Sequence, residues 1–418
     1  MKGEDSMTIE EIGRNAKTAS RALAVADAEK KNAALYAMAD ALENNKDKIL
    51  AANKADVDAA RGNIPDAMLD RLSLTSERIR AMAKGMRDVA ALPDPVGKIL
   101  SENTRPNGIK IRKVSAPIGV IAIIYEARPN VTADSAALCL KSGNAVILKG
   151  GKEAANSNLA IENAMNGALE EAGLPKTCVQ VLEDNSRETA AKLMRMNEYV
   201  DLLIPRGGSG LISAVVKNAS VPVIQTGAGV CHTYVDKDAD VKMAAEIIFN
   251  AKTSRPSVCN ACDCMLVHKD IAPEALPVIA DKLHEKNVEI RGDERVMDII
   301  SGCTPANEDD WGKEYLDYII SAHIVDDVDA AIAHITDFGT GHSECIVTEN
   351  EKTAKYFMEH VDAAAVYHNA STRFTDGGEF GLGAEIGIST QKLHARGPMG
   401  LQELTSYKYM VFGNGQIR

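Results

Sequence analysis

The sequence predicts an α/β protein with two domains, each built on a parallel sheet that helices cover. Two alternating stretches indicate this class, because short apolar runs separate helical segments from Ile118 to Gln225 and again from Tyr234 to Val366. Apolar strands that alternate with helices are typical of parallel sheets buried on both faces. A third observation adds a smaller element: the Asn107-Gly108 step between two β-prone runs predicts a protruding hairpin.

Length and composition agree with a soluble, multidomain enzyme. The chain has 418 residues, 45% apolar content and a net charge of -12. Its length exceeds that of one typical domain. Its charges of both signs are mixed, so a nucleic acid or an anionic membrane is not expected as a partner. No apolar run reaches membrane-spanning length and the first seven residues lack the apolar core of a signal peptide, so we expect a cytoplasmic protein. Eight cysteines are too few for a disulfide framework.

Residues 8 to 90 are predicted to form a set of amphipathic helices, because apolar residues recur at helical spacing, as in 33–42. Turn residues at 62–65 divide the set, and the proline-rich segment 92–97 closes it. After it, runs 97–100 and 109–114 flank the predicted hairpin turn. The C-terminal run 404–412 reads as one more strand.

The first alternating stretch carries two glycine-rich turns, Lys149-Gly-Gly-Lys152 and Arg206-Gly-Gly-Ser-Gly210. In parallel sheets the ligand lies beyond the carboxyl ends of the strands, and glycines there let backbone N–H groups approach a phosphate. Neither turn is a Gly-x-Gly-x-x-Gly fingerprint, so a simple strand-to-helix corner is the alternative. The expected strands of this stretch are 118–124, 145–149, 178–182, 200–205 and 221–225, with helices at 132–141 and 153–171; the second stretch should hold helices at 243–250 and 272–284 and strands at 265–268 and 318–325.

A candidate nucleophile follows an Arg-Pro turn in the second stretch. Pro256 disfavours helix at Arg255, so Cys259 should follow a defined bend that favours access. The alternative is a small buried hydrophobic residue, a common state of free cysteine. Cys259, Cys262 and Cys264 with His268 could form a zinc site. A structural zinc site requires a second pair of ligands, however, so no metal is expected.

Several segments resemble one known family. Phe249-Asn-Ala-Lys-Thr-Ser-Arg-Pro-Ser-Val-Cys-Asn-Ala261 is similar to the nucleophile segment of gamma-glutamyl phosphate reductases, members of the aldehyde dehydrogenase superfamily. The segments 125–132, 328–346 and 394–409 are also similar to that family. The resemblance implies an aldehyde dehydrogenase-like fold and NADPH-dependent reduction of L-glutamate 5-phosphate to L-glutamate 5-semialdehyde, with release of phosphate. This is the second step of proline biosynthesis, and Cys259 would form a thioester intermediate.

The resemblance also implies cofactor contacts. Lys149 corresponds to a lysine that contacts the adenosine ribose, and Lys152 is a candidate for a 2′-phosphate, although a solvated lysine is the alternative. Glu379 and Phe380 lie near the position of a Glu-x-Phe stretch that contacts the nicotinamide ribose, but here the two residues are adjacent. The turn expected near the diphosphate and the nicotinamide ribose consists of Arg206, Gly207, Gly208 and Ser209.

Substrate contacts are expected from polar residues in the segments 125–132 and 249–261. Arg128 can clamp a phosphate or carboxylate through two hydrogen bonds, and Asn130 can donate to a developing oxyanion. Arg255 is a further substrate-binding candidate. We interpret His342 as a hydrogen-bonded structural histidine rather than a catalytic acid, because the superfamily's mechanism does not require one.

Three departures from the family pattern are visible. Phe338 stands where relatives have His or Tyr. Cys262 and Cys264 replace apolar or hydroxyl residues, which makes a Cys259–Cys262 disulfide conceivable. Gln225 stands at the strand end where hydrolytic aldehyde dehydrogenases carry a water-activating glutamate. An amide cannot act as a general base, so we expect phosphate rather than water to accept the acyl group.

The resemblance implies a division of labour along the chain. Residues 1–96 and 117–233, with 367–394 returning to them, would bind the cofactor, and 234–366 would carry the nucleophile. A hairpin and tail would form an oligomerisation element, with an edge hairpin of the subunit's own sheet as the alternative. The expected partners are a second copy of the chain and the glutamate 5-kinase that supplies the substrate. Rival functions are another aldehyde or acyl-CoA-linked dehydrogenase, or a catalytically silent nucleotide-binding protein. The oligomerisation element comprises 97–116 and 395–418.

Overall fold

The computed structural model describes residues 7–418, which form two compact units. Unit 1 comprises the described residues up to Gln225 together with Gly381–Gly387 and Met399–Arg418. Unit 2 comprises Thr226–Phe380 and Ile388–Pro398. The expected division assigned 226–233, 367–380 and 388–394 to the cofactor-binding domain. In the structure they belong to unit 2, because the strands of its sheet include β7 (Cys231–Val235) and β13 (Ala365–His368).

Unit 1 begins with amphipathic helices, as the apolar spacing predicts. The first is fixed by a capping box, in which the Thr8 hydroxyl accepts from the Glu11 N–H at 3.2 Å and the Glu11 carboxylate accepts from the Thr8 N–H at 2.8 Å. None of the helices between residues 7 and 418 is long and apolar enough to cross a membrane. The helices that precede the first strand are α1 (Ile9–Leu23), α2 (Ala28–Asn44), α3 (Lys46–Ala60), α4 (Asp66–Leu72) and α5 (Ser76–Ala91).

The sheet of unit 1 has four parallel strands in the order β5-β4-β3-β6. The predicted strand at 221–225 is wrong: only Val223 forms a bridge, to Leu203. Pro222 has no N–H to donate, which favours a single bridge over a full ladder. The elements are β3 (Val120–Tyr125), α6 (Asn130–Lys141), β4 (Ala145–Lys149), η1 (Lys152–Ala154), α7 (Ala155–Glu171), η2 (Lys176–Cys178), β5 (Val179–Val181), α8 (Arg187–Leu193), β6 (Leu202–Arg206) and α9 (Ser209–Asn218).

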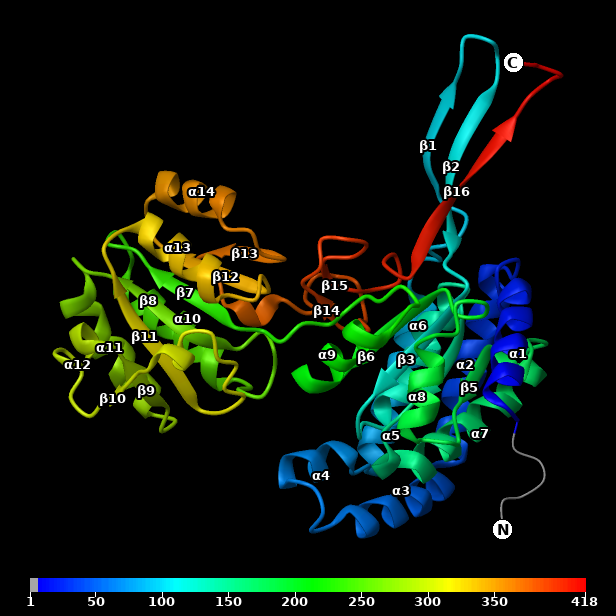
Figure 1. The fold of residues 1–418 in the computed structure, drawn as a ribbon, viewed down its shortest axis with the longest axis horizontal. Coiled ribbons are helices and arrows are strands. Elements are labelled where there is room, and N and C mark those ends of the chain that lie inside the picture. Colours follow the sequence, from blue (N-terminus) through cyan, green and yellow to red (C-terminus); the bar gives the residue numbers. More distant parts are fainter. Residues whose placement is uncertain (1–6) are drawn as a thin grey trace. The chain divides into compact units, whose positions relative to one another are not determined.

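A three-stranded antiparallel ribbon extends from the rest of unit 1 (Figure 1). The predicted hairpin is confirmed as β1 (Ile99–Thr104) and β2 (Lys110–Pro117), joined by a turn in which Gly108 adopts a φ of 87°. The predicted C-terminal strand is β16 (Thr405–Phe412), which pairs with β2 along its whole length. The ribbon therefore joins two segments far apart in the sequence.

The sheet of unit 2 has seven strands in the order β10-β9-β11-β8-β7-β12-β13, and its described pairings are parallel. Side chains of β8 alternate between two cores: Met265 and Val267 pack with α10 and α11, whereas Cys264 and Leu266 pack with α13 and α14. Further elements are α10 (Val241–Thr253), β8 (Cys262–His268), α11 (Ala272–His284), β9 (Glu289–Gly292), α12 (Glu294–Met297), β10 (Thr304–Pro305), η3 (Glu308–Asp310), β11 (Ile319–Val325), α13 (Val328–Phe338), β12 (Ser343–Val347), α14 (Glu351–His360), η4 (Thr372–Phe374), β14 (Ile388–Ser389) and β15 (Gly397–Pro398).

Candidate active site

The candidate nucleophile lies in a turn at the edge of the unit 2 sheet. Cys259 is half-buried and stands between α10 and β8. Because β8, β7 and β12 are parallel neighbours, the residues that precede them meet at the same edge. Those residues are Cys259, Gly229 and His342, which lie far apart in the sequence. The sheet order thus assembles a site from three loops.

His342 is the direct partner of the thiol. Its Nε2 lies 3.2 Å from Cys259 Sγ, and its Nδ1 lies 2.8 Å from Ser343 Oγ. Burial lowers the pKa of His342 to about 4, so the imidazole is neutral near pH 7. In the tautomer that carries its proton on Nδ1, this group donates to Ser343 and Nε2 is free to accept the thiol proton. The arrangement matches a nucleophile activated by an adjacent base.

A chain of hydroxyl groups continues behind His342. Ser343 Oγ lies 2.6 Å from Thr375 Oγ1, which in turn lies 2.7 Å from the Tyr367 hydroxyl. Ser343 and Thr375 are buried, so their hydrogen bonds hold the imidazole orientation without competition from water. Sequence analysis interpreted His342 as structural; its distance from Cys259 Sγ makes it a candidate base.

Close backbone packing fixes the nucleophile turn. A Cβ atom on Gly229 would lie 1.5 Å from the Cys259 carbonyl oxygen, so this position admits only glycine. The Gly229 N–H donates to the Glu314 carboxylate at 3.0 Å. The Cys231 thiol donates to the same Cys259 carbonyl at 3.2 Å. The turn therefore has neighbours on the β7 side that leave it little room to shift.

Two arginines bring positive charge to the nucleophile turn. The half-buried Arg373 guanidinium donates to Asn260 Oδ1 and, at 3.1 Å, to Ser254 Oγ. Burial lowers the pKa of Arg373, and repulsion from Arg255 adds to this effect. Arg255, predicted to bind substrate, is exposed. Sequence analysis missed Arg373, although an arginine beside a candidate thiol is well suited to bind an anion.

A buried ion pair joins the two ends of the nucleophile turn. Lys252 Nζ, near the end of α10, lies 2.7 Å from Asp263 Oδ1 on β8, and both side chains are at most 1% exposed. Burial raises the pKa of Asp263 to about 6, while attraction to Lys252 opposes the rise. The pair ties helix and strand together on either side of Cys259.

Unit 1 presents the predicted cofactor residues at the carboxyl ends of its strands. Lys149 ends β4 and is half-buried, and burial lowers its pKa. Lys152 is exposed in η1. Arg206 ends β6, followed by Gly207, Gly208 and the first residue of α9, Ser209.

The glycines of this turn pack closely against the Glu126 carboxylate. A Cβ atom on Gly207 would lie 2.6 Å from the Glu126 carboxyl carbon. The Gly208 N–H, at the N-terminal cap of α9, donates to Glu126 Oε1 at 3.1 Å. An acceptor oxygen already uses this N–H, which shows that the turn can hold an anionic oxygen. These residues fit the diphosphate of a dinucleotide.

Other predicted residues have local partners. Asn130 is the exposed first residue of α6 and donates from Nδ2 to Asp134 Oδ2 at 3.0 Å, while burial raises the pKa of Asp134 to about 6. Arg128 lies in the same part of unit 1, half-buried. Glu379 and Phe380 are exposed residues of unit 2. The roles of these four residues stay predictions.

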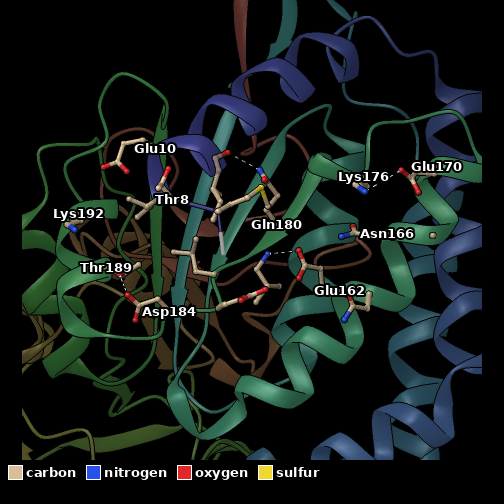
Figure 2. A pocket seen from close by; sticks show the side chains of 18 residues that line it. Thr8, Glu10, Glu162, Asn166, Glu170, Lys176, Gln180, Asp184, Thr189 and Lys192 are labelled. Carbon is tan, nitrogen blue, oxygen red and sulfur yellow. Dashed lines mark hydrogen bonds and ion pairs between the residues drawn. The ribbon is translucent and has the colours of Figure 1, made fainter. Parts of the chain in front are cut away.

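A separate cavity of about 660 Å³ lies in unit 1, between the start of α1, α7, β5 and α8 (Figure 2). Acidic, basic and neutral polar side chains share its labelled wall, and burial raises the pKa of Glu162 to about 7. None of the predicted cofactor or substrate residues lines it. We therefore assign it no part in the site.

The four residues considered as zinc ligands, Cys259, Cys262, Cys264 and His268, do not point toward one common site. All eight cysteines are free thiols. Cys262 donates to Thr233 Oγ1 at 3.4 Å, and His268 Nδ1 accepts from the Asp270 N–H at 3.1 Å. Cys264 faces the opposite core, beside His334. The conceivable Cys259–Cys262 disulfide is not formed.

Comparison with known proteins agrees with the fold. A model of the aldehyde dehydrogenase family matches residues 1–301. The solved structure of gamma-glutamyl phosphate reductase from Thermotoga maritima is 49% identical, covers 98% of this chain and 99% of that one, and superposes with a TM-score of 0.96. Two parallel sheets and a thiol at the edge of one thus define an aldehyde dehydrogenase-like protein, as the sequence predicted.

Sequence relatives narrow the class. Gamma-glutamyl phosphate reductase of Clostridium beijerinckii is 59% identical over 408 residues, covering 97% of this chain and 98% of that protein. The enzyme of the same name from Heliobacterium modesticaldum is 56% identical over 407 residues, with the same coverage. The chain therefore belongs to the aldehyde dehydrogenase family and, within it, to the gamma-glutamyl phosphate reductases. The aldehyde dehydrogenase family uses NAD or NADP.

Proposed function

We propose that the chain reduces L-glutamate 5-phosphate to L-glutamate 5-semialdehyde, with NADPH as hydride donor and release of phosphate. The observation that carries the proposal is the 3.2 Å approach of His342 Nε2 to Cys259 Sγ at the edge of the unit 2 sheet. A thiol with an adjacent base is suited to attack an activated acyl group. Family membership supports the acyl phosphate as that group.

The first half-reaction transfers the acyl group to the protein. His342 Nε2 takes the Cys259 proton, and the thiolate attacks the carbonyl carbon of the acyl phosphate. A thioester bond forms as the carbon–oxygen bond to phosphate breaks. The imidazolium returns its proton to the departing phosphate. Arg373 and Arg255 lie near the turn, where their charge favours a phosphate or carboxylate.

The second half-reaction releases the aldehyde. NADPH, when bound, supplies a hydride to the thioester carbon. The carbon–sulfur bond then breaks, the aldehyde leaves, and the Cys259 thiolate takes up a proton from solvent through His342. The hydroxyl chain from Ser343 to Tyr367 keeps the imidazole in one orientation through both halves.

We infer that unit 1 holds the cofactor. Lys149 and the turn from Arg206 to Ser209 would bind its ribose and diphosphate, and Lys152 would favour NADPH over NADH by pairing with a 2′-phosphate. Support comes from the glycine turn at the carboxyl ends of β3, β4 and β6, where Gly208 already donates to an anionic oxygen. Asn130 and Arg128 remain the proposed oxyanion donor and phosphate clamp, and Glu379 and Phe380 the proposed ribose contacts.

Location and partners follow from the proposed reaction. We propose a cytoplasmic homo-oligomer that receives its labile acyl phosphate from glutamate 5-kinase. The exposed apolar residues of the ribbon support self-association.

The proposed function is tested in the oxidative direction. Purified protein receives glutamate semialdehyde and NADP⁺, with phosphate, with arsenate or with neither, and NADPH is followed by absorbance. We expect sustained NADPH formation only with phosphate or arsenate, because Gln225 cannot activate water. Sustained formation without either anion would assign the chain to hydrolytic aldehyde dehydrogenases. Dependence on coenzyme A instead would assign it to the acyl-CoA-linked enzymes.

A further inference from the structure

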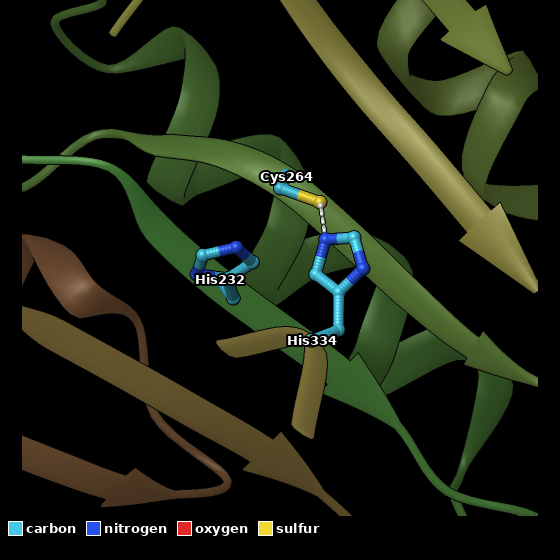
Figure 3. Close-up of side chains that lie close together, drawn as sticks. All are labelled: His232, Cys264 and His334. Atoms are coloured by element: carbon cyan, nitrogen blue, oxygen red, sulfur yellow. Dashed lines mark hydrogen bonds between the residues drawn. The ribbon is translucent and has the colours of Figure 1, made fainter. Parts of the chain in front are cut away.

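Three metal-ligating side chains gather in the interior of unit 2. They are His232 on β7, Cys264 on β8 and His334 on α13, and one ligand atom from each lies within 4.8 Å of the others (Figure 3). His232 and Cys264 have no exposed surface, and His334 is 8% exposed. None of the three is part of the proposed reaction. The alternation of β7 and β8 places the first two on the same face of the sheet, beneath α13.

His232 is held in the orientation of a metal ligand. Its Nδ1 lies 2.9 Å from Glu344 Oε2, and its backbone N–H donates to the same oxygen at 2.8 Å. The carboxylate thereby makes Nδ1 the donor and leaves Nε2 as the nitrogen that can bind a metal. Nε2 is fully buried and has no hydrogen-bond partner. Histidines that bind zinc usually donate from their other ring nitrogen to a carboxylate in this way.

We propose that His232, Cys264 and His334 form a buried zinc site. Cys264 Sγ lies 3.7 Å from His334 Nε2. Zinc bonds of ordinary length, at a tetrahedral angle, separate a nitrogen and a sulfur ligand by about 3.5 Å. This pair therefore needs little adjustment, whereas the distances to the His232 nitrogen, which are at most 4.8 Å, would shorten on zinc binding. Two imidazoles and a thiolate select a borderline or soft ion and disfavour Mg²⁺ or Ca²⁺, which require oxygen ligands.

Charge and surroundings agree with a buried ion that three protein ligands hold, with its fourth tetrahedral position taken by a water. The two charges of Zn²⁺ are balanced by the Cys264 thiolate and the Glu344 carboxylate, so the buried group is neutral as a whole. The rings of Trp311, His323 and Phe338 surround His334, with centroids 4.7 to 5.8 Å from its own. Such a closed site is filled as the chain folds and released only when it opens. The ion would clamp β7 and β8 to α13.

The test measures zinc in the purified full-length chain after expression in zinc-supplemented medium and dialysis against EDTA. We expect about one zinc per chain in the native protein and release of that zinc after unfolding in denaturant. Cys264→Ser should lower the retained zinc by roughly tenfold or more. Cys262→Ser is the matched control, because this buried neighbour on the same strand faces Thr233 instead, and it should retain the ion.

A second measurement separates this site from the Cys259–His342 pair, which can also bind zinc. Cys259→Ser protein keeps all three proposed ligands and is refolded with Co²⁺ alone. We expect the near-ultraviolet thiolate-to-cobalt absorption in Cys259→Ser and its loss in Cys259→Ser/Cys264→Ser. If native protein retains no zinc and refolded Cys259→Ser shows no such absorption, the cluster is a hydrogen-bonded core without metal and the proposal is wrong. Absorption that survives in the double variant would also overturn it.

Discussion

His342 Nε2 lies 3.2 Å from Cys259 Sγ although 83 positions separate the two residues. Their proximity follows from the sheet. Cys259 shortly precedes β8 and His342 directly precedes β12, and β7 is the parallel neighbour of both strands. The base is thus placed by strand order, while the thiol is placed by a local turn.

Replacing His342 by glutamine should lower kcat by roughly 10²–10⁴-fold, the usual contribution of a general base. Glutamine keeps a polar group near Ser343 but cannot take the thiol proton. KM for the substrate should change little. His360→Gln, an exposed histidine on α14, is the control and should retain full activity. Steady-state rates of both variants check the prediction, and a fully active His342→Gln protein would contradict it.

Stability should fall as the pH drops from about 6.5 to about 4. Burial lowers the pKa of His342 to about 4, so the unfolded chain binds a proton in this interval that the folded chain does not. The His342 contribution to the free energy of unfolding is present above pH 6.5 and lost toward pH 4, on the order of 3 kcal/mol. Urea unfolding across this range should be less pH-dependent in His342→Gln than in the unmodified chain. Equal slopes would contradict it.

Cys259 should be the cysteine that iodoacetamide modifies first. It is half-buried beside a base, whereas Cys139 and Cys178 are fully buried and burial raises the pKa of both thiols, that of Cys178 to about 12. Peptide mapping after brief alkylation gives the order of modification. Cys259→Ser should abolish turnover and leave NADPH binding intact, as measured by fluorescence titration. Turnover close to normal in that variant would disprove the proposed nucleophile.

Gly229→Ala should inactivate the protein by at least about 10²-fold, because a 1 Å displacement of a reacting group has costs of this size. The added Cβ would lie 1.5 Å from the Cys259 carbonyl oxygen, so the nucleophile turn must move. Gly167→Ala is the control, since a Cβ there meets no atom within 4 Å and alanine favours the α7 helix. Activity and thermal unfolding of both variants should be compared; an active Gly229→Ala protein would refute the backbone interlock.

The ribbon should mediate self-association. Tyr409 and Val411 are 61% and 60% exposed on the same face of β16, more than a monomer's strand usually leaves in water. Tyr409→Asp/Val411→Asp should convert the oligomer to monomers at micromolar concentration, measured by light scattering. Lys408→Asp, on the other face of the strand, should leave assembly unchanged. A monomeric unmodified chain would rule out this role for the ribbon.

Local patterns predicted much of the fold. The bounds of β4 and α11 agree with the expected 145–149 and 272–284, and both ribbon segments were located correctly. These elements depend on apolar periodicity and on turn residues that lie within a few positions of one another. The expected strand at 221–225 is wrong because Pro222 interrupts the pairing. The proline is a local signal, but the prediction gave more weight to the apolar residues around it.

Pairwise geometry between distant segments could not be predicted in the same way. Arg373 reaches Asn260 from η4, which follows β13, and His232 of β7 meets His334 of α13. Each contact depends on strand order, which the sequence pattern does not give. A usable signal was present for His342: it stands directly before a buried strand, as Cys259 does before another, and parallel neighbours align such positions.

The Lys252–Asp263 pair fixes the register of β8 relative to α10, on either side of the nucleophile turn. Side chains of β8 alternate between two apolar layers, so a slip of β8 by one residue would turn Asp263 toward the wrong layer and leave Lys252 buried without a counter-charge. Apolar residues of similar size could pack in both places, but they would tolerate the slip. The pair therefore constrains the number of residues between α10 and β8. An insertion or deletion among residues 254–261 should prevent folding, and not merely lower activity.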